Sequence, residues 1–247
     1  MNHRLLLISI ALILFSVLLS TQAESGQSEQ LEISNKPSKN TYLTGELVDL
    51  NLRLDNKSTR DVTIKNGFSV LDGYLKVYIS SNGIDFEEYF NTKWGTKDGA
   101  SKPITLKPNE AIETSATLLW NYKPALYSSK PLKDKIATDY AFPNPGNYLV
   151  KSKFVVYLSD SKEPITIESD PVSISITEPV GEDLEVWMKI KDRGDIAFFL
   201  QEGAVRSGNK DEQDKLVNDV QQILSLHPGS MYSQRLRENL ESFTKKK

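Results

Sequence analysis

Apolar and polar residues alternate in several short segments of the first 178 residues. The pattern is strongest over residues 48–54, where four apolar side chains are separated by Asp49, Asn51 and Arg53. A period of two places one set of side chains on a buried face and the other in water, which is typical of β-strands. Further segments with strand character are 62–64, 75–79, 112–118, 148–158 and 172–176. Turn residues separate these segments, so the pattern predicts an antiparallel β-sandwich.

Beyond Pro179 the apolar residues recur at the spacing of an α-helix. Asn209 is a candidate N-cap, Glu212 is placed to complete a capping box, and Pro228-Gly229 ends this helix. Ser230 is placed to cap the helix that follows. The predicted apolar faces consist of Leu184, Trp187 and Met188; Leu216, Val220, Ile223 and Leu224; and Tyr232, Leu236, Leu240 and Phe243.

The segment Asn144 to Val150 (NPGNYLV) resembles the tyrosine corner of immunoglobulin-like domains. In those domains a Tyr at the start of a late strand bonds back to the preceding turn, two residues before a Cys of the antibody disulfide. Tyr148 matches that Tyr, and Val150 stands where the Cys would be. The resemblance therefore implies the sandwich without its disulfide. The region 46–56 also looks like the first core strand of many bacterial immunoglobulin-like modules.

The segment 227–232 (HPGSMY) is similar to the helix–turn–helix of tetratricopeptide-type repeats, although the sequence shows no second copy. Taken whole, the chain resembles uncharacterised bacterial exported proteins with such a sandwich and a helical C-terminal tail. We therefore expect a mainly β protein, with an immunoglobulin-like antiparallel sandwich over residues 31–178 and a small α-helical region over 179–247. A chain that ends near Glu178 is expected to fold without the tail.

The N-terminus has the pattern of a secretory signal. Arg4 precedes an apolar run over residues 5–20, and Thr21-Gln22-Ala23 follows it. The run is shorter than the roughly 20 apolar residues that a membrane-spanning helix needs. We predict a signal peptide over 1–23, a flexible linker over 24–30, and an exported protein of the periplasm or the extracellular space. The alternative is a retained N-terminal membrane anchor.

The residue inventory excludes several kinds of chemistry. The chain has no Cys, and its two His are His3 and His227, so disulfides and zinc sites built from Cys and His are not expected. The sequence contains no G-x-S-x-G elbow and no glycine-rich phosphate-binding motif. We expect His227 to cap a helix end. The net charge of −3 argues against a nucleic-acid partner, which would need a basic surface.

One group of oxygen-bearing side chains is close together in the sequence. Asp55, Asn56 and Asp61 could be arranged around calcium, a cation that takes six to eight oxygen ligands. Their spacing does not fit an EF-hand loop, so turn formation is the favoured interpretation. No cofactor and no metal are expected.

Two segments between strands are long enough to suggest a binding role, 86–103 and 120–142. They are rich in aromatic side chains, which offer large contact areas together with a polar atom. These residues are either a contact surface or the cover of an enlarged core. The candidates are Tyr89, Phe90, Trp94, Trp120, Tyr122, Tyr127, Tyr140 and Phe142.

The function expected from these features is recognition without catalysis. The preferred interpretation is an exported binding or adaptor protein of the cell envelope, which contacts a protein partner through sandwich loops, the helical tail or both. The first alternative is binding of carbohydrate or cell-wall glycan through the insertion aromatics, with Trp94 and Trp120 decisive. Proteinase inhibition is a third, because Gly45-Glu46 and Asp55-Asn56 are similar to segments of some bacterial sandwich inhibitors. A carboxylate-dependent hydrolase is the last.

Overall fold

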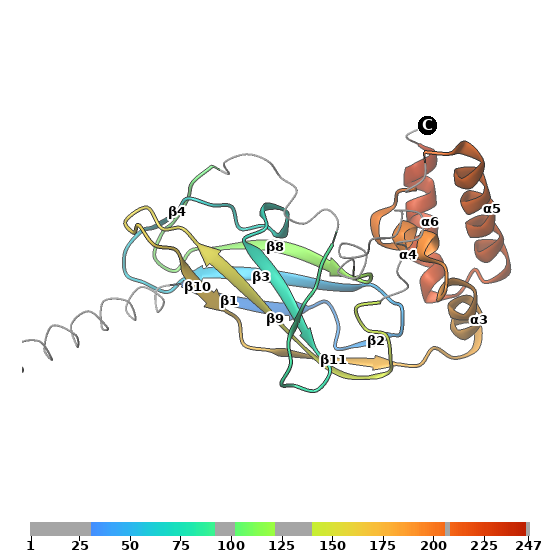
Figure 1. The fold of residues 1–247 in the computed structure, drawn as a ribbon, viewed down its shortest axis with the longest axis horizontal. Coiled ribbons are helices and arrows are strands. Elements are labelled where there is room, and N and C mark those ends of the chain that lie inside the picture. Colours follow the sequence, from blue (N-terminus) through green and yellow to red (C-terminus); the bar gives the residue numbers. More distant parts are fainter. Residues whose placement is uncertain (1–30, 92–101, 122–139, 206–207, 246–247) are drawn as a thin grey trace, which may run out of the picture.

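The computed structural model describes residues 31–91, 102–121, 140–205 and 208–245. A β-sandwich comes first, and four helices follow at one end of it (Figure 1). The strands are β1 (Leu31–Pro37), β2 (Thr41–Leu43), β3 (Val48–Asn56), β4 (Val62–Ile64), β5 (Leu75–Ser80), β6 (Glu87–Glu88), β7 (Ile104–Leu106), β8 (Ala111–Leu118), β9 (Gly146–Val156), β10 (Ile165–Glu168) and β11 (Val172–Thr177). The helices are the 3-10 turn η1 (Val70–Asp72), α3 (Gly181–Ile190), α4 (Gly194–Glu202), α5 (Lys210–Leu226) and α6 (Met231–Thr244).

The sandwich consists of two main sheets. One has the strand order β1-β3-β8, and the other has the order β2-β11-β9-β5-β6, with β10 also paired to β9. The pairs are antiparallel except β2 with β11, which is parallel. A short β4-β7 ribbon continues the β3-β8 pair. The mainly β class and the antiparallel sandwich followed by helices are therefore as the sequence predicted.

The alternating residues of β3 form the centre of the core. Val48, Leu50, Leu52 and Leu54 are all at most 1% exposed, whereas Asp49, Asn51 and Arg53 lie on the outer face. Apolar residues of the opposite sheet complete this core; among them Val77, Val150 and Phe154 are fully buried. The sandwich thus has a hydrophobic core of its own, distinct from the one among the helices.

The predicted tyrosine corner is present. The Tyr148 hydroxyl donates to the backbone oxygen of Asn144 at 2.9 Å. The Tyr148 ring packs edge-on against Phe142, with the ring centroids 5.1 Å apart. This bond fixes the turn that leads into β9, the strand that pairs with both β5 and β11.

The predicted N-cap of α5 is confirmed, whereas the predicted capping bond of α6 is replaced by another contact. Asn209 caps α5, since its side chain accepts from the Asp211 backbone N–H at 2.9 Å. Ser230 stands at the N-cap of α6, but its hydroxyl donates to Asp183 of α3 at 2.9 Å. The same Asp183 oxygen accepts the Met231 backbone N–H at 2.8 Å, so a carboxylate from another helix satisfies the α6 N-terminus.

The predicted apolar face of α3 is wrong in two of its three positions. Val186 and Ile190 are buried, whereas Leu184 and Met188 are 43% and 56% exposed. Trp187 does pack inward. None of the described helices is both long and apolar enough to cross a membrane. The predicted signal peptide and linker lie outside the described residues.

Candidate functional site

The helical region packs against the end of the sandwich where β3 begins and β8 ends. Leu43, Leu47 and Leu119 of the sandwich join the hydrophobic cluster of the helices. The Trp187 ring lies between two tyrosines. Its centroid is 5.0 Å from that of Tyr140, in an edge-on contact, and 6.3 Å from that of Tyr232, in a stacked one. The contact therefore combines apolar and aromatic packing from both parts of the chain.

Buried hydrogen bonds make this junction specific. The Tyr232 hydroxyl donates to the Thr44 backbone oxygen at 2.6 Å, and the Tyr140 hydroxyl donates to the Ile190 backbone oxygen at 3.2 Å. Burial raises the pKa of both phenols above the ordinary value for Tyr. Both groups therefore keep the proton that these bonds require.

Gln201 of α4 makes a second set of junction bonds. Its side-chain oxygen accepts from the Trp120 backbone N–H at 2.9 Å, and its Nε2 donates to the Tyr89 hydroxyl at 3.2 Å. The Leu119 backbone N–H also donates to that hydroxyl at 3.2 Å. Burial raises the pKa of Tyr89. A polar residue that the sequence analysis did not single out thus ties the helices to the sandwich.

Five of the eight aromatic candidates belong to the described residues, and these five do not form one exposed surface. Tyr89, Trp120 and Phe142 are 2%, 2% and 4% exposed, so they fill the interior rather than face a partner. Phe90 and Tyr140 are half-buried and pack beside the junction. These five residues therefore pack as the cover of an enlarged core, which is the second of the two interpretations that the sequence left open. Trp94, Tyr122 and Tyr127 lie outside the described residues.

Exposed apolar side chains gather instead on the helical region. Of the nine large hydrophobic residues that are exposed among those described, five belong to residues 179–245. Three of these, Val180, Leu184 and Met188, follow one another at intervals of four residues on α3 and its N-cap, at 75%, 43% and 56% exposure. This spacing places them along one side of the helix. We call these three residues the α3 stripe; the other two are Leu226 and Met231.

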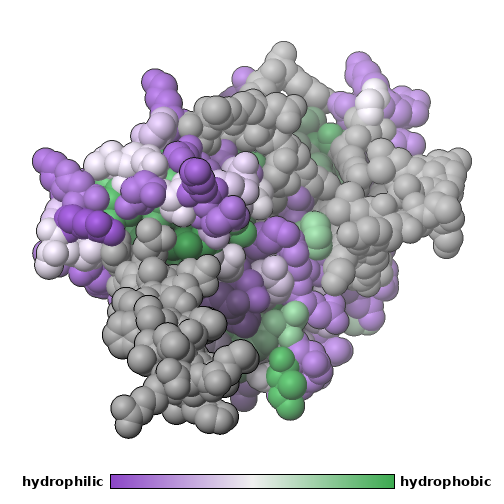
Figure 2. Space-filling model, turned by 60° about the vertical axis from the view of Figure 1, so that its left-hand side comes forward, coloured by the Kyte–Doolittle hydropathy of each residue, from purple (hydrophilic) through white to green (hydrophobic). Residues whose placement is uncertain are grey.

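The sandwich surface is different in character. Its exposed large hydrophobic residues are Leu71, Tyr74, Ile84 and Tyr157; the Tyr74 and Tyr157 rings are in edge-on contact with their centroids 5.6 Å apart, and Ile84 lies in a separate loop. Figure 2 shows mainly hydrophilic residues among those coloured on that side of the molecule, with small hydrophobic areas between them. Isolated exposed apolar residues are ordinary on a protein surface, whereas a row on one helix is a better indication of a contact site.

A polar cleft of about 400 Å³ lies beside the tyrosine corner. Its lining residues include Asn82, Asp85, Glu87, Tyr140, Asn144 and Tyr148. Several of these groups have partners already, since Asn82 Nδ2 donates to Asp85 at 2.9 Å. The mixture of amides, carboxylates and rings is chemically suited to hydroxyl-rich ligands.

His227 lies among charged side chains rather than beside a hydroxyl nucleophile. It follows the last residue of α5 and is 6% exposed. Its Nε2 is 2.7 Å from Lys189 Nζ, and its Nδ1 is 3.4 Å from a Glu185 carboxylate oxygen. Both partners belong to α3, so His227 joins α3 to the α5–α6 turn. The described contacts give it a structural role.

Two of the three candidate calcium residues, Asp55 and Asn56, form turn and ion-pair contacts. Asp55 accepts two hydrogen bonds from Arg53, at 2.9 and 3.1 Å, and these lower its pKa. The Asn56 side-chain oxygen accepts from the Ser58 backbone N–H at 3.0 Å, and its Nδ2 donates to the Arg60 backbone oxygen at 2.9 Å. Across the parts of the chain that the structure describes, no three His, Asp or Glu side chains form a group suited to a metal.

Comparison with known proteins supplies no family. No family model matches the chain, and no curated protein matches it. Solved structures with a similar fold include the CARDB domain of a Pyrococcus furiosus protein in complex with di-metal ions, at 14% identity and a TM-score of 0.29, covering 60% of this chain and 87% of that one. The C-terminal domain of wzt matches at 8% identity and a TM-score of 0.34, covering 61% and 75%.

The sporulation control protein Spo0M from Bacillus subtilis is also similar, at 12% identity and a TM-score of 0.30. The match covers 65% of this chain and 54% of Spo0M, so this chain spans about half the length of that protein. At such identities and TM-scores, none of the three transfers a ligand or an activity to this chain.

Proposed function

We propose that the protein is an exported, non-enzymatic adaptor of the cell envelope that binds a protein partner through the α3 stripe. The observation that carries this proposal is the row of three exposed apolar side chains on a helix that is otherwise well anchored. Trp187 packing and the Tyr140 bond to Ile190 hold α3 in place, and the Tyr232 bond to Thr44 holds the neighbouring α6 against the sandwich. A rigid helix that presents apolar side chains is suited to helix-mediated recognition.

The test is cross-linking in cells, followed by recovery of the tagged chain and comparison of two variants. Leu184→Asp with Met188→Asp places two charges in the stripe, and because both sites are exposed the fold should tolerate them. Ile84→Asp is the matched control, since Ile84 is 81% exposed and belongs to the sandwich. We expect one cross-linked species to be lost in the stripe variant and retained in the control.

Leu184 and Met188 are about half exposed, so burying the rest of each side chain in a complex is worth about 0.7–1.5 kcal/mol, and loss of both contacts should weaken binding at least about tenfold. Equal recovery of the same species from both variants would exclude the α3 stripe as the contact. Fractionation of the cells tests the exported location in the same experiment.

Glycan binding is the second candidate, and the polar cleft supports it. The buried position of Trp120 counts against sugar stacking on that ring, because the ring presents almost no surface. Glu87→Gln and Asn144→Ala should weaken retention on immobilised cell-wall glycan if the cleft binds it, and the α3 stripe variant should not. Retention that is independent of both cleft changes argues against this candidate.

A further inference from the structure

Among the described residues, no strand pairs with the outer edge of β8; just beyond its last residue, Leu119 accepts the Ala141 backbone N–H at 2.7 Å, so the open edge ends at Thr117. β8 pairs with β3 on one side only, and it forms the end of the β1-β3-β8 sheet. Asp49 of β3 accepts a backbone hydrogen bond from Ser38 on the β1 side, and Asn56 donates one to Glu110 on the β8 side. Odd-numbered residues of β3 therefore bond toward β1 and even-numbered residues toward β8, as an antiparallel ladder requires.

The β3–β8 register shows which residues of β8 bond to β3 and which point outward. Leu52 lies opposite Thr114 and Leu54 opposite Ile112, so the even-numbered residues of β8 bond to β3. The N–H and C=O groups of Glu113, Ser115 and Thr117 consequently point away from the sheet. The described backbone hydrogen bonds give none of these outward groups a partner.

β8 lacks the usual protection of an edge. Its eight residues, AIETSATL, contain no Pro and no Lys, and only one charged residue. Natural sheets commonly shield an edge by Pro, Lys, a bulge or a short strand. The one bulge here lies before the strand begins, where Asn109 has φ 64° and both Asn109 and Glu110 bond to Asn56. Ile112 and Thr114 are only half-buried, so an added strand would complete their cover.

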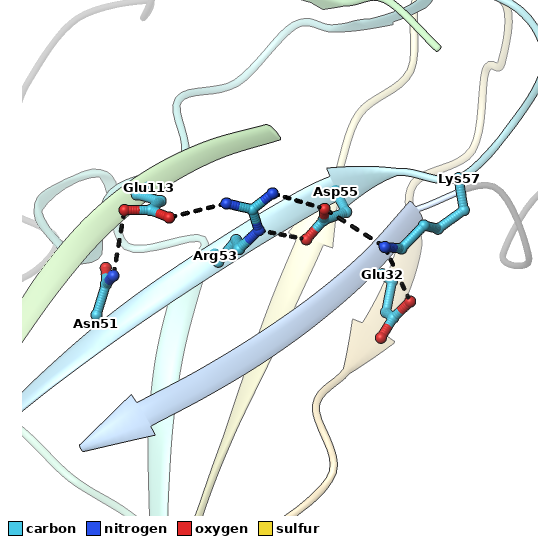
Figure 3. A network of polar contacts seen from close by, with 6 residues as sticks. All are labelled: Glu32, Asn51, Arg53, Asp55, Lys57 and Glu113. Carbon is cyan, nitrogen blue, oxygen red and sulfur yellow. Dashed lines mark hydrogen bonds and ion pairs between the residues drawn. The ribbon is translucent and has the colours of Figure 1, made fainter. Parts of the chain in front are cut away.

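Charges beside the edge indicate what kind of strand would fit. Figure 3 shows a row of polar contacts across the outer face of this sheet, with Glu113 of β8 at one end and Glu32 of β1 at the other. The row contains three carboxylates and two cations: Glu32, Asp55 and Glu113, with Arg53 and Lys57. Glu113 keeps half of its side-chain surface exposed although Arg53 Nη1 is 3.0 Å away. One further cation at the β8 edge would balance the row.

We propose that β8 binds an extended segment of a partner protein by strand addition, and that this segment carries alternating apolar residues with a Lys or Arg beside Glu113. The outward backbone groups provide the affinity, and the half-buried Ile112 and Thr114 favour apolar side chains on the inner face. A second copy of β8 would bring no basic residue, because its sequence has none. This surface is separate from the α3 stripe and does not depend on the proposed function.

The test uses a fluorescein-labelled peptide of sequence Thr-Val-Lys-Val-Thr-Val-Lys-Val, with the same peptide carrying a central Pro as the negative probe. Binding is measured by fluorescence anisotropy with the full chain. Ser115→Pro removes an outward N–H without removing a bond to β3, so the sheet should stay intact. Ser115→Thr is the matched control. We expect Ser115→Pro to weaken binding at least about tenfold and Ser115→Thr to preserve it.

Hydrogen exchange provides the second readout. In the free protein the amides of Glu113, Ser115 and Thr117 should exchange faster than those of Thr114 and Ala116, and the peptide should slow the first group alone. Glu113→Gln should weaken binding several-fold at low salt and have little effect at high salt.

Three results would overturn the proposal. The first is a wild-type chain that binds the alternating peptide no better than the Pro-containing probe. The second is equal binding by Ser115→Pro with unchanged melting of that variant. The third is dimerisation of the wild-type chain that Ser115→Pro abolishes, since this would identify a second copy as the occupant of the edge.

Discussion

Gly45 offers a direct test of how the helical region is held against the sandwich. Its φ is +77°, in the left-handed region that favours glycine. A Cβ added to Gly45 would lie 2.1 Å from Trp187 Cζ3, far inside contact distance. The Trp187 ring has little freedom to move away, because Tyr140 and Tyr232 lie against it.

The Gly45→Ala substitution therefore has two costs. The backbone cost at positive φ is about 1 kcal/mol, and displacement of a packed ring adds about 1–3 kcal/mol. Gly83→Ala is the matched control, since its φ is also +77° but its added Cβ would meet only Leu149 Cδ1, at 3.6 Å. The free energy of unfolding should thus fall by about 2 kcal/mol more for Gly45→Ala than for Gly83→Ala.

The assay is thermal unfolding of both variants, followed by circular dichroism and by tryptophan fluorescence. For a protein of this size the difference corresponds to about 4–8 °C in Tm. In a Trp187→Ala background the extra cost of Gly45→Ala should disappear, because no ring is then displaced. Equal losses of Tm for Gly45→Ala and Gly83→Ala would refute the reasoning, since they would show that Trp187 does not press on Gly45.

Three further outcomes are expected. Tyr148→Phe removes the bond to Asn144 and should lower the free energy of unfolding by about 1 kcal/mol in denaturant titration, with the β-type spectrum unchanged. Burial raises the pKa of Asp195, but hydrogen bonds from Arg193 lower it by more, so the pKa is below the ordinary value for Asp. The stability contributed by this ion pair is therefore present above about pH 4 and lost as the pH falls below it. The difference in Tm between wild type and Asp195→Asn should shrink from pH 7 to pH 3. A chain ending at Glu178 should keep a cooperative β-type melt because the sandwich has its own core. It should self-associate on size exclusion, because removal of the helices exposes Leu43, Leu47 and Leu119. A monomer with unchanged Tm would show that the contact between helices and sandwich adds no stability.

The longer elements of the fold could be predicted from sequence because they bury one face against many neighbours. β3, β8 and β9 alternate over eight or more residues, and α5 combines a regular apolar face with Asn209 as its cap. The Tyr148 bond was predicted from the resemblance of residues 144–150 to a tyrosine corner, which is a local signature because the partner lies four residues away. In these cases the sequence contains the information that decides the structure.

Other features depend on contacts between distant residues. β2 has only three residues and exists through its parallel pairing with β11, more than 130 positions later. α3 carries apolar residues around most of its circumference, so the sandwich and not its periodicity decides that Trp187 faces inward and Met188 outward. β1, β6, β7 and β10 are likewise short or weakly patterned.

The candidate site was the least accessible to sequence reasoning. Aromatic side chains in long connections have no periodicity that distinguishes a buried ring from an exposed one. Tyr89 and Trp120 lie in the interior beside Gln201 of α4, some 80 to 110 residues later, which forms hydrogen bonds with both. The unpaired edge of β8 also follows from the order of strands in a sheet, which a strand pattern alone does not give.

The direction of β3 gives the protein two opposite poles. Leu31 begins β1 opposite Asn56, at the end of β3 away from the helices, whereas Val48 and Leu118 lie at the end that the helices cover. Eight strand steps, about 26 Å, separate these ends. Any attachment made by the chain ahead of Leu31 would therefore act at the pole opposite the helical region and the α3 stripe.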